Sequence, residues 1–471
     1  MGKNGKSAQK DRTFMKKINL PFSQIAKYLI ATLLVIVPLL PKFPFIDVPG
    51  TYVSIRFEDF LLAITAVFTF FKITRSAKSV KNVFSDDIIR AITLFILIAS
   101  VSLFAGIFLT QTVVPNVGLL HLLRRVEYFV PFFAVLAFFP QDKDKNVEFY
   151  IKILMIVVFV AFLYGVGEKY FNLPVIVTQN SEYSKGIALN WIPGSQITST
   201  FAGHYDLAAF MVLVLPIFIS LFFIVKDRMS KIFLLLASLS GYWLLINTAS
   251  RISFVSYLGA VCISLFLIKK SKAIIAVVII SVILSGFSTS LFARYTNLIN
   301  VYLQKVKNVK IVNARPFNLN ISAQELTPPP EAPKPVIEDR STSIRLNVEW
   351  PRAIRAFMKN PLIGTGYSSI GLAADNDYLR LLAEVGILGF ASFALIIVRI
   401  MLVFASSLPL TEKLFGINLG FVAGAVGGLF GVLLNAVFID VFEASKFAII
   451  FWLLMGLAVY LVKDRSYVQK N

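Results

Sequence analysis

The sequence predicts an all-α fold: a polytopic transmembrane helical bundle of about twelve spans, with one large extracytoplasmic insert before the late spans. Of the 471 residues, 57% are hydrophobic and 15% are charged, whereas soluble chains average about 45–50% and about 25%. The apolar excess falls in continuous blocks of roughly 17–25 residues, the length at which a helix crosses a bilayer. Because lipid cannot satisfy backbone polar groups and the blocks do not alternate with polar residues, helices are favoured over a closed barrel.

The spans are expected in two groups, which the insert separates. Nine precede it, centred on 25–41, 57–72, 88–109, 119–139, 150–170, 205–225, 232–248, 252–268 and 272–290. Three follow it, centred on 378–403, 416–438 and 447–462. The expected regions are a basic cytoplasmic tail (1–24), a first membrane region (25–290), the insert (291–377), a second membrane region (378–463) and a cytoplasmic tail (464–471).

The distribution of basic residues predicts the orientation of these spans. The tails and connections on one side carry 22 Lys and Arg residues, and the short connections on the other side carry five. Basic loops tend to stay in the cytoplasm, so both termini are expected there and the insert is expected outside. The same topology explains the formal net charge of +20, and no nucleic-acid partner is expected.

The insert contains a Pro-rich stretch, TPPPEAPKP at 327–335, which is typical of an extended linker. After it, Pro351 is well placed to begin a helix. An apolar stripe, opposed by Arg345, Arg352, Arg355 and Lys359, is formed by Ile344, Val348, Ile354, Phe357 and Met358. This pattern suits a helix on the outer membrane face, and equally a helix packed on the rest of the insert.

Ionisable residues in or beside a span are functional candidates, since charge near hydrocarbon is costly. The candidates at the predicted outer ends of spans are Arg56, Glu58, Asp59, His204, Asp206, Arg251, Asp375, Asn376, Asp377, Asp440 and Glu443, with Arg124, Arg125 and Glu127 in the outer half of the fourth span. A buried ion pair between Arg124 or Arg125 and Glu127 or Glu58 is an open structural alternative.

Structural alternatives also exist for the other candidates. His204 and Asp206 would cap the span that follows them. Asp440 and Glu443 would be solvated acids of a short outer turn. For Arg251 a functional role is favoured, because it lies between two apolar blocks on the side where arginine is scarce.

Arginine at the outer membrane level indicates an anionic partner, because its planar guanidinium binds phosphate through two hydrogen bonds and stays charged. A lipid-linked diphosphate would hold its charged group at this depth and its tail among the helices. No metal or cofactor is expected, because the sequence has one cysteine, two histidines and no HExxH pattern. Arginine would then neutralise the charge that a metal neutralises elsewhere.

Several stretches together carry a family resemblance: SIRFEDFLL, LLRRVEYF, STFAGHYDLAAFMVLVLP, TASRISF, DRSTSIRLNVEWPRAIRAFMKNPLIGTGY, DNDYLRLLAEVGILGF and FIDVFEASKFAIIFWLLMGL. In this order, with one large outer loop before DNDYL, they resemble the O-antigen ligase and O-antigen polymerase superfamily of bacterial membrane glycosyltransferases. The resemblance implies glycan transfer from undecaprenyl diphosphate to an acceptor hydroxyl, without a metal and with inversion at the anomeric carbon.

The implied location is the outer face of the bacterial plasma (inner) membrane, and the acceptor would be another glycan or a lipid. The residues do not separate ligation from polymerisation. A transporter or flippase for lipid-linked oligosaccharide is the alternative from another class, although the chain shows no halved symmetry of the kind many carriers have.

The resemblance also implies roles for single residues. Ligases of the family carry His-Asn just before a late span, where this chain has Asp375-Asn376. Asp375 would take the proton from the acceptor hydroxyl and Asn376 would orient a substrate. The alternative is that Asp375 caps the helix that starts near Asn376. Many relatives also carry an arginine before the "TF" of the middle stretch, about where Gln196 stands here.

The donor diphosphate is expected to bind Arg251 together with Arg124 or Arg125. Arg56, His204 and Asp206 complete the predicted substrate-binding set, which draws on spans from both halves of the sequence.

Overall fold

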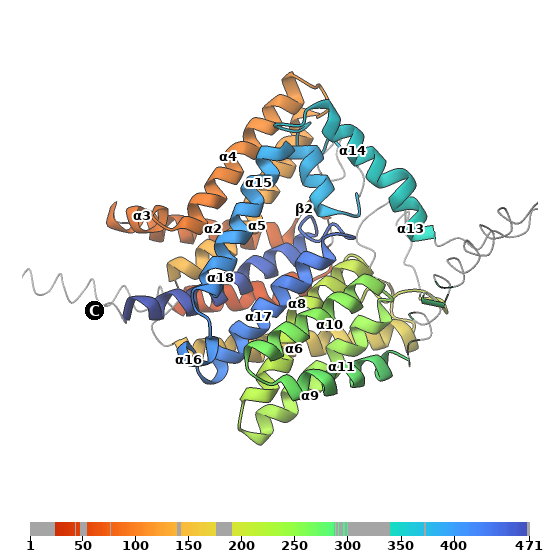
Figure 1. The fold of residues 1–471 in the computed structure, drawn as a ribbon. Helices are drawn as coiled ribbons and strands as arrows, with labels where there is room; N and C mark the ends of the chain where they lie inside the picture. Colours follow the sequence, from red (N-terminus) through yellow and green to blue (C-terminus); the bar gives the residue numbers. More distant parts are fainter. Residues whose placement is uncertain are drawn as a thin grey trace, which may run out of the picture.

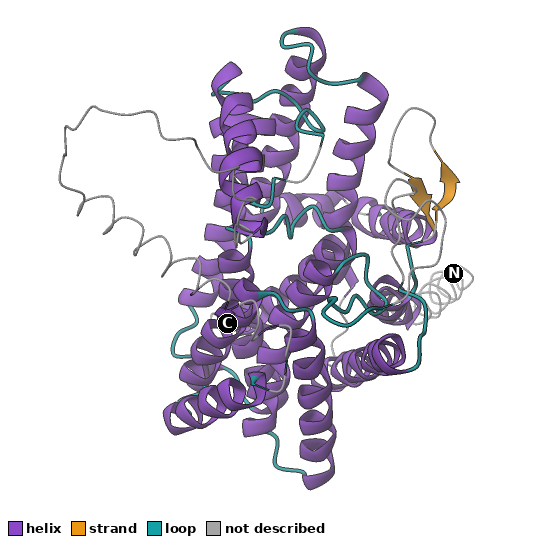
Figure 2. Cartoon of the chain, turned by 90° about the vertical axis from the view of Figure 1, so that its right-hand side faces the viewer, coloured by secondary structure: helices purple, strands orange, loops and turns teal. Residues whose placement is uncertain are grey.

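The computed structural model describes residues 24–42, 44–47, 54–75, 77–138, 143–175, 191–286, 340–371 and 374–468, with a few single positions between 288 and 299. These residues are almost entirely helical (Figure 2). Apart from helices they contain one short antiparallel ribbon, in which β1 (Pro44–Asp47) pairs with β2 (Ser54–Arg56). The expectation of an all-α fold is confirmed.

The helices follow the expected order along the chain. A first helix at Gln24–Leu39 is followed by α2 (Phe57–Thr74), α3 (Ala77–Phe84), α4 (Asp87–Phe108), α5 (Pro115–Phe138), α6 (Lys143–Tyr170), α8 (His204–Ile224), α9 (Arg228–Asn247), α10 (Arg251–Leu267), α11 (Ser271–Ser285), α13 (Arg340–Ile344), the π-helical η1 (Arg345–Glu349), α14 (Trp350–Lys359), α15 (Asp377–Ala405), α16 (Leu410–Lys413), α17 (Gly416–Asn435) and α18 (Ser445–Val468).

Every predicted span coincides with a helix, and seven of these helices are long and apolar enough to cross a membrane. The first helix, α10 and α11 are apolar but shorter. The remaining two, α2 and α5, carry the charged groups that the sequence placed at or near their outer ends. The predicted split near Arg251 agrees with the structure, because α9 ends at Asn247 and α10 begins at Arg251. The count of twelve spans stays a prediction.

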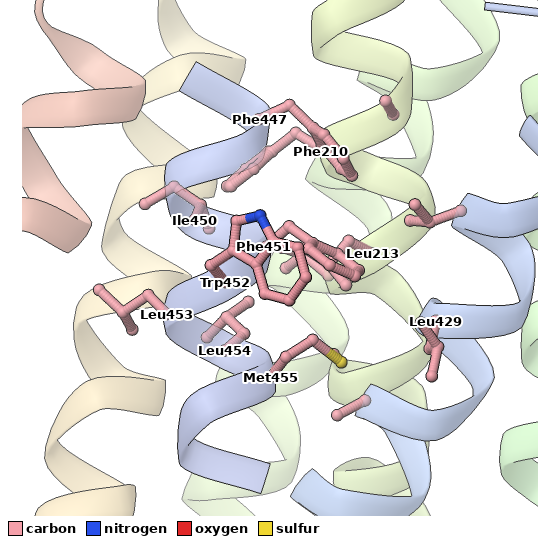
Figure 3. Packing of buried hydrophobic residues seen from close by; sticks show 14 of the residues in the cluster. Phe210, Leu213, Leu429, Phe447, Ile450, Phe451, Trp452, Leu453, Leu454 and Met455 are labelled. Carbon is pink, nitrogen blue, oxygen red and sulfur yellow. The ribbon is translucent and has the colours of Figure 1, made fainter. Parts of the chain in front are cut away.

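The core is formed by α8, α17 and α18, and α10 packs against the first two. Residues 207–221 of α8 are all buried, and Figure 3 shows Phe210 and Leu213 of this helix beside Phe447 and Phe451 of α18. Glycine lets α17 approach α8 closely: a Cβ at Gly424 would lie 2.3 Å from the Cα of Ile217. Small residues at such contacts are typical of membrane helices, which associate through close van der Waals packing.

The helix α15 is broken near its start, at Gly386, where φ is +68°. The break exposes backbone groups that lipid could not satisfy, and the loop before the helix pairs with them. Gly366 N donates to Glu384 O at 2.8 Å, and Ile387 N donates to Pro361 O at 2.8 Å. The loop that contains the GTGY sequence is therefore built into the helix break, and its glycines serve close packing of backbones.

The α13–η1–α14 arm of the insert is helical without interruption, since Ile344, Glu349 and Trp350 at its junctions all have helical φ and ψ. Pro351 lies in the first turn of α14, but the helical arm begins before it, at Arg340, and not at Pro351 as predicted. In Figure 1 the arm lies across one end of the bundle at the right, while α3 and the end of α18 lie at the left. We call the end at the right the predicted outer face, since the topology expects the insert there and the C-terminus on the other side.

The apolar stripe of this arm is largely exposed: Val348 is 52% exposed and Met358 is 69% exposed. The opposite side is turned inward, where Ala353 and Arg345 are buried. A helix packed on the described part of the insert would bury its stripe, so the arrangement favours the membrane-surface alternative.

Candidate functional site

Asp440, in the loop between α17 and α18, organises the start of α15. Its Oδ2 accepts a hydrogen bond from Ala374 N at 2.8 Å, and its Oδ1 accepts one from Asn376 N at 2.9 Å. Arg380 Nη1 also reaches Oδ2 at 3.0 Å, and Arg380 Nε lies 3.6 Å from Glu384 Oε1. The interpretation of Asp440 as a solvated loop acid is wrong, because this carboxylate is bound on several sides.

Arg125 connects α5 to the same loop. Its Nη1 donates to Phe442 O at 2.7 Å, its Nη2 forms an ion pair with Glu443, and its guanidinium lies 5.7 Å from the ring centroids of both Tyr128 and Tyr367. Glu443 is thus also not a solvated acid, and its partner is buried.

The expected partners of the two adjacent arginines differ from those in the structure. Arg124 Nη2 reaches Asp59 Oδ2 at 3.1 Å, while Arg125 pairs with Glu443. The open alternative of a buried ion pair is thus right in kind but not in its acids, since the partners in the structure are Asp59 and Glu443 where Glu58 and Glu127 were considered. Arg124 therefore faces α2, and Arg125 faces the α17–α18 loop.

Asp375 is bound by Arg345 of the surface arm. Arg345 Nε and Nη2 lie 2.9 and 2.8 Å from Asp375 Oδ2, and Nη2 also donates to the Tyr205 hydroxyl at 3.0 Å. The two charged side chains are 10% and 22% exposed. Burial raises the pKa of the Asp375 carboxyl, and Asp440 raises it further, while Arg345 opposes both. The insert thus places the Arg345 guanidinium against Asp375, the predicted base.

The residue that caps α15 is Asn376, whose Oδ1 accepts a hydrogen bond from Leu379 N at 2.9 Å. The alternative that Asp375 is the cap is therefore wrong: Asp375 lies one residue before the cap, with φ at +46°. The next carboxylate, Asp377, is buried and accepts a hydrogen bond from Phe442 N at 3.1 Å. Of the two acids, Asp375 is the more accessible to a substrate.

Arg251 begins α10, with Ser250 as the N-cap residue. Ser253 Oγ donates to Asn435 Oδ1 at 3.0 Å, which joins the start of α10 to the end of α17. The adjacent Ala436 carbonyl accepts a hydrogen bond from Asp377 N at 3.0 Å. Two polar links therefore join the helix start that carries Arg251 to the start of α15. The role of Arg251 in binding the diphosphate stays a prediction.

His204 and Asp206 lie in the first turn of α8, whose N-cap is Gly203, so neither is the N-cap itself. The His204 ring lies on Tyr205, with the ring centroids 4.0 Å apart. Asp206 Oδ2 is 3.9 Å from Lys42 Nζ. The structure thus separates them: His204 stacks on the tyrosine that touches Arg345, and Asp206 faces a second group of charges.

This second group, the lysine cluster, lies where the first helix, the ribbon, α2, α8 and α18 meet. Its members are Lys42, Arg56, Glu58, Asp206 and Lys446. Arg56 Nη1 lies 3.9 Å from Glu58 Oε1 and donates to Ser445 Oγ at 3.4 Å. Lys446 is fully buried, and its Nζ donates to Thr200 O at 2.5 Å and Pro38 O at 3.2 Å.

Sequence reasoning missed several residues of these groups. Arg345 was assigned to the polar face of an amphipathic helix, although it lies in the stretch SIRLNVEW that carries part of the resemblance. Lys42 and Lys446 were counted only toward orientation. Glu349 was not singled out, yet burial and then the charge of Asp375 raise its pKa to about 7. Its Oε2 is buried and has no hydrogen-bond partner among the described residues.

Comparison with known families gives a match in the second half of the chain. Residues 232–394 match the family model described as O-antigen ligase. The resemblance to the O-antigen ligase and polymerase superfamily is confirmed. The matched region contains Arg251, Arg345 and the Asp375-Asn376 pair, whereas Arg124 and the other earlier candidates lie outside it. No curated protein matches the chain. Within the described residues, no group of three His, Cys, Asp or Glu side chains is placed to hold a metal ion.

Proposed function

We propose that the protein is a glycosyltransferase that moves a glycan from undecaprenyl diphosphate to an acceptor hydroxyl at the outer face of the bacterial plasma membrane. The O-antigen ligase match supports the general role. The observation that carries the proposal is the ion pair between Arg345 and Asp375, because it joins an anion-binding group to a carboxylate inside the matched region. The products would be surface polysaccharide, formed by ligation or polymerisation.

The donor would bind through its diphosphate to Arg345 and Arg251, whereas Arg125 is held by the Phe442 carbonyl and Glu443. Guanidinium groups bind phosphate oxygens in pairs of parallel hydrogen bonds and stabilise the charge that develops on a leaving diphosphate. Arg345 Nε and Nη2 are both engaged with Asp375 Oδ2 in the protein alone. A diphosphate that draws Arg345 away would release the carboxylate at the moment the donor is in place.

Asp375 would then act as the general base. The acceptor hydroxyl oxygen forms a bond to the anomeric carbon, its proton moves to Asp375, and the bond from that carbon to the diphosphate oxygen breaks. The electron pair of the broken bond leaves on the diphosphate, which Arg345 and Arg251 neutralise without a metal. A positioned base contributes roughly 10²–10⁴-fold to such a step, and attack from the opposite face inverts the anomeric carbon.

The test uses purified protein and a lipid-linked glycan, with release of undecaprenyl diphosphate as the readout. Arg345→Lys keeps the charge but loses the fork of donors. We expect transfer to fall by at least about tenfold, which corresponds to ~1.4 kcal/mol. The matched control is Arg355→Lys on the exposed side of the same arm, which should transfer normally. Normal transfer by Arg345→Lys would contradict the proposed role of Arg345.

A further inference from the structure

The lysine cluster holds more positive than negative groups and pairs them loosely. Lys42, Arg56 and Lys446 stand against Glu58 and Asp206. Among the described residues, the closest approaches between opposite charges within the cluster are 3.9 Å, from Lys42 to Asp206 and from Arg56 to Glu58. Those distances exceed hydrogen-bond length. The neighbouring pair of Arg124 and Asp59 is closer, at 3.1 Å, so the loose contacts are a property of the cluster.

Two further features show that the cluster is costly in the protein alone. Glu58 Oε1 is buried and has no hydrogen-bond partner among the described residues. Burial lowers the pKa of Lys42 to about 8, although Asp206 opposes this shift. Cations held together in a dry site repel one another, and such perturbed groups mark functional sites more often than structural ones. A bound anion with several charges would relieve the repulsion.

A lipid is the natural carrier of that anion, because an apolar path begins beside the cluster. One face of α2, directly after Arg56, presents Phe57, Phe60, Ile64, Val67 and Phe71 at helical spacing. These side chains are between 42% and 63% exposed. A lipid whose charged head lies at Arg56 would rest its tail along this face, whereas a soluble phosphate would make no use of it.

We propose that the lysine cluster binds a second lipid-linked diphosphate, the glycan acceptor, so that the reaction is polymerisation rather than ligation to a different class of acceptor. The inference rests on the proposed function, in which Arg345 and Arg251 hold the donor. The first group is held on the α17–α18 loop, where Arg125 contacts the Phe442 carbonyl and Arg380 pairs with Asp440, whereas Lys446 lies in the first turn of α18, after the loop. Each substrate would then have a separate anchor, and the acceptor's outermost sugar would reach Asp375.

The site should weaken as pH rises through about 8, where Lys42 loses its proton. The charged groups that face Lys42 are Asp206 from α8, Arg56 from the ribbon, Glu58 from α2, Arg124 from α5 and Lys446 from α18. The two carboxylates hold the proton on Lys42 and the three cations oppose it. A bound diphosphate adds negative charge, so it should also shift this titration upward.

The experiment counts bound molecules of geranylgeranyl diphosphate by native mass spectrometry and measures their affinities by calorimetry. We expect wild-type protein to bind two molecules. Lys42→Gln should weaken one of them by at least about tenfold, because it removes a charged donor to the diphosphate. Glu58→Gln should tighten the same molecule, because it removes a competing negative charge. A gain in affinity cannot come from a misfolded protein.

Three results would overturn the inference. They are a single bound molecule in wild-type protein, two unchanged affinities in both variants, and binding of inorganic diphosphate as tight as that of the lipid, which would show that the lipid tail contributes nothing. Arg345→Gln separates this site from the donor site, because it should weaken only the other molecule. If Arg345→Gln leaves both affinities unchanged while Lys42→Gln weakens one, the proposed donor site fails and the second site stands.

Discussion

Replacement of Asp375 by Asn separates catalysis from stability at the centre of the site. Asn tolerates the left-handed backbone at this position, where φ is +46°. It also keeps an oxygen that can accept from Arg345, whose Nε donates to Asp375 Oδ2 at 2.9 Å and whose Nη2 lies 2.8 Å from the same oxygen. The change therefore removes charge and basicity while the local geometry is retained.

The expected magnitudes follow from these contacts. A charge-assisted hydrogen bond is roughly twice as strong as a neutral one, and a neutral one contributes about 1 kcal/mol. Asp375→Asn should thus cost about 1 kcal/mol of stability, which leaves the protein folded in the membrane. Loss of a general base should lower the rate of transfer about a hundredfold or more, or ~2.7 kcal/mol of barrier.

The assay compares the rate of undecaprenyl diphosphate release at equal levels of folded protein. Asn376→Asp is the matched control for stability, because Asp caps a helix as well as Asn does, whereas Asn376→Ala should cost about 1 kcal/mol. Asp375→His should retain part of the activity, since imidazole can also accept the proton. Near-normal transfer by Asp375→Asn would refute the base assignment, and the helix cap could not explain a loss because Asn376 provides it.

Three other expectations test the fold and its surroundings. Gly386→Ala should cost about 2 kcal/mol or more, because φ is +68° and the new Cβ would lie 2.4 Å from a carbonyl oxygen; Gly371→Ala, at positive φ in open space, should cost less, and equal melting temperatures would contradict this. In the wild-type protein the free energy of unfolding should fall as pH rises from 4.5 to about 7, because the folded pKa of Glu349 lies above its ordinary value. Glu349→Gln should remove this fall, and parallel pH–stability curves for the two proteins would count against that titration. Lys359→Cys, exposed on the polar side of the same arm, with Cys262 replaced by Ser, should react with an impermeant thiol reagent from outside the membrane, and protection would reverse the predicted orientation.

The spans could be predicted because their signal is local. The length of an apolar run shows directly whether it can cross a bilayer as a helix. Arg251 likewise lies at a boundary that polar residues mark in the sequence. The break at Gly386 could not be predicted in the same way. It depends on the loop that docks there, whose backbone supplies the hydrogen bonds that the helix loses.

The charged contacts could be predicted only as a set of candidates. Asp440 and Glu443 are near each other in a short turn, which usually faces water. Here their carboxylates pair with arginines from α5 and α15. Such pairs cannot be read from a local pattern, since Arg125 lies 317 residues along the chain from Phe442, whose carbonyl it also contacts. Arg345 follows the same rule: its helical pattern indicates a polar face, but only the packing of the arm shows which arginine on that face contacts Asp375.

The most direct measurement of the central claim follows the fate of the donor lipid. Purified protein is reconstituted with its lipid-linked glycan, and the products are separated by mass spectrometry. The account predicts release of one undecaprenyl diphosphate for each new glycosidic bond, with release lost in Asp375→Asn at an unchanged level of folded protein. A lipid-linked glycan that crosses the bilayer but is never consumed would contradict the account and indicate a transporter instead.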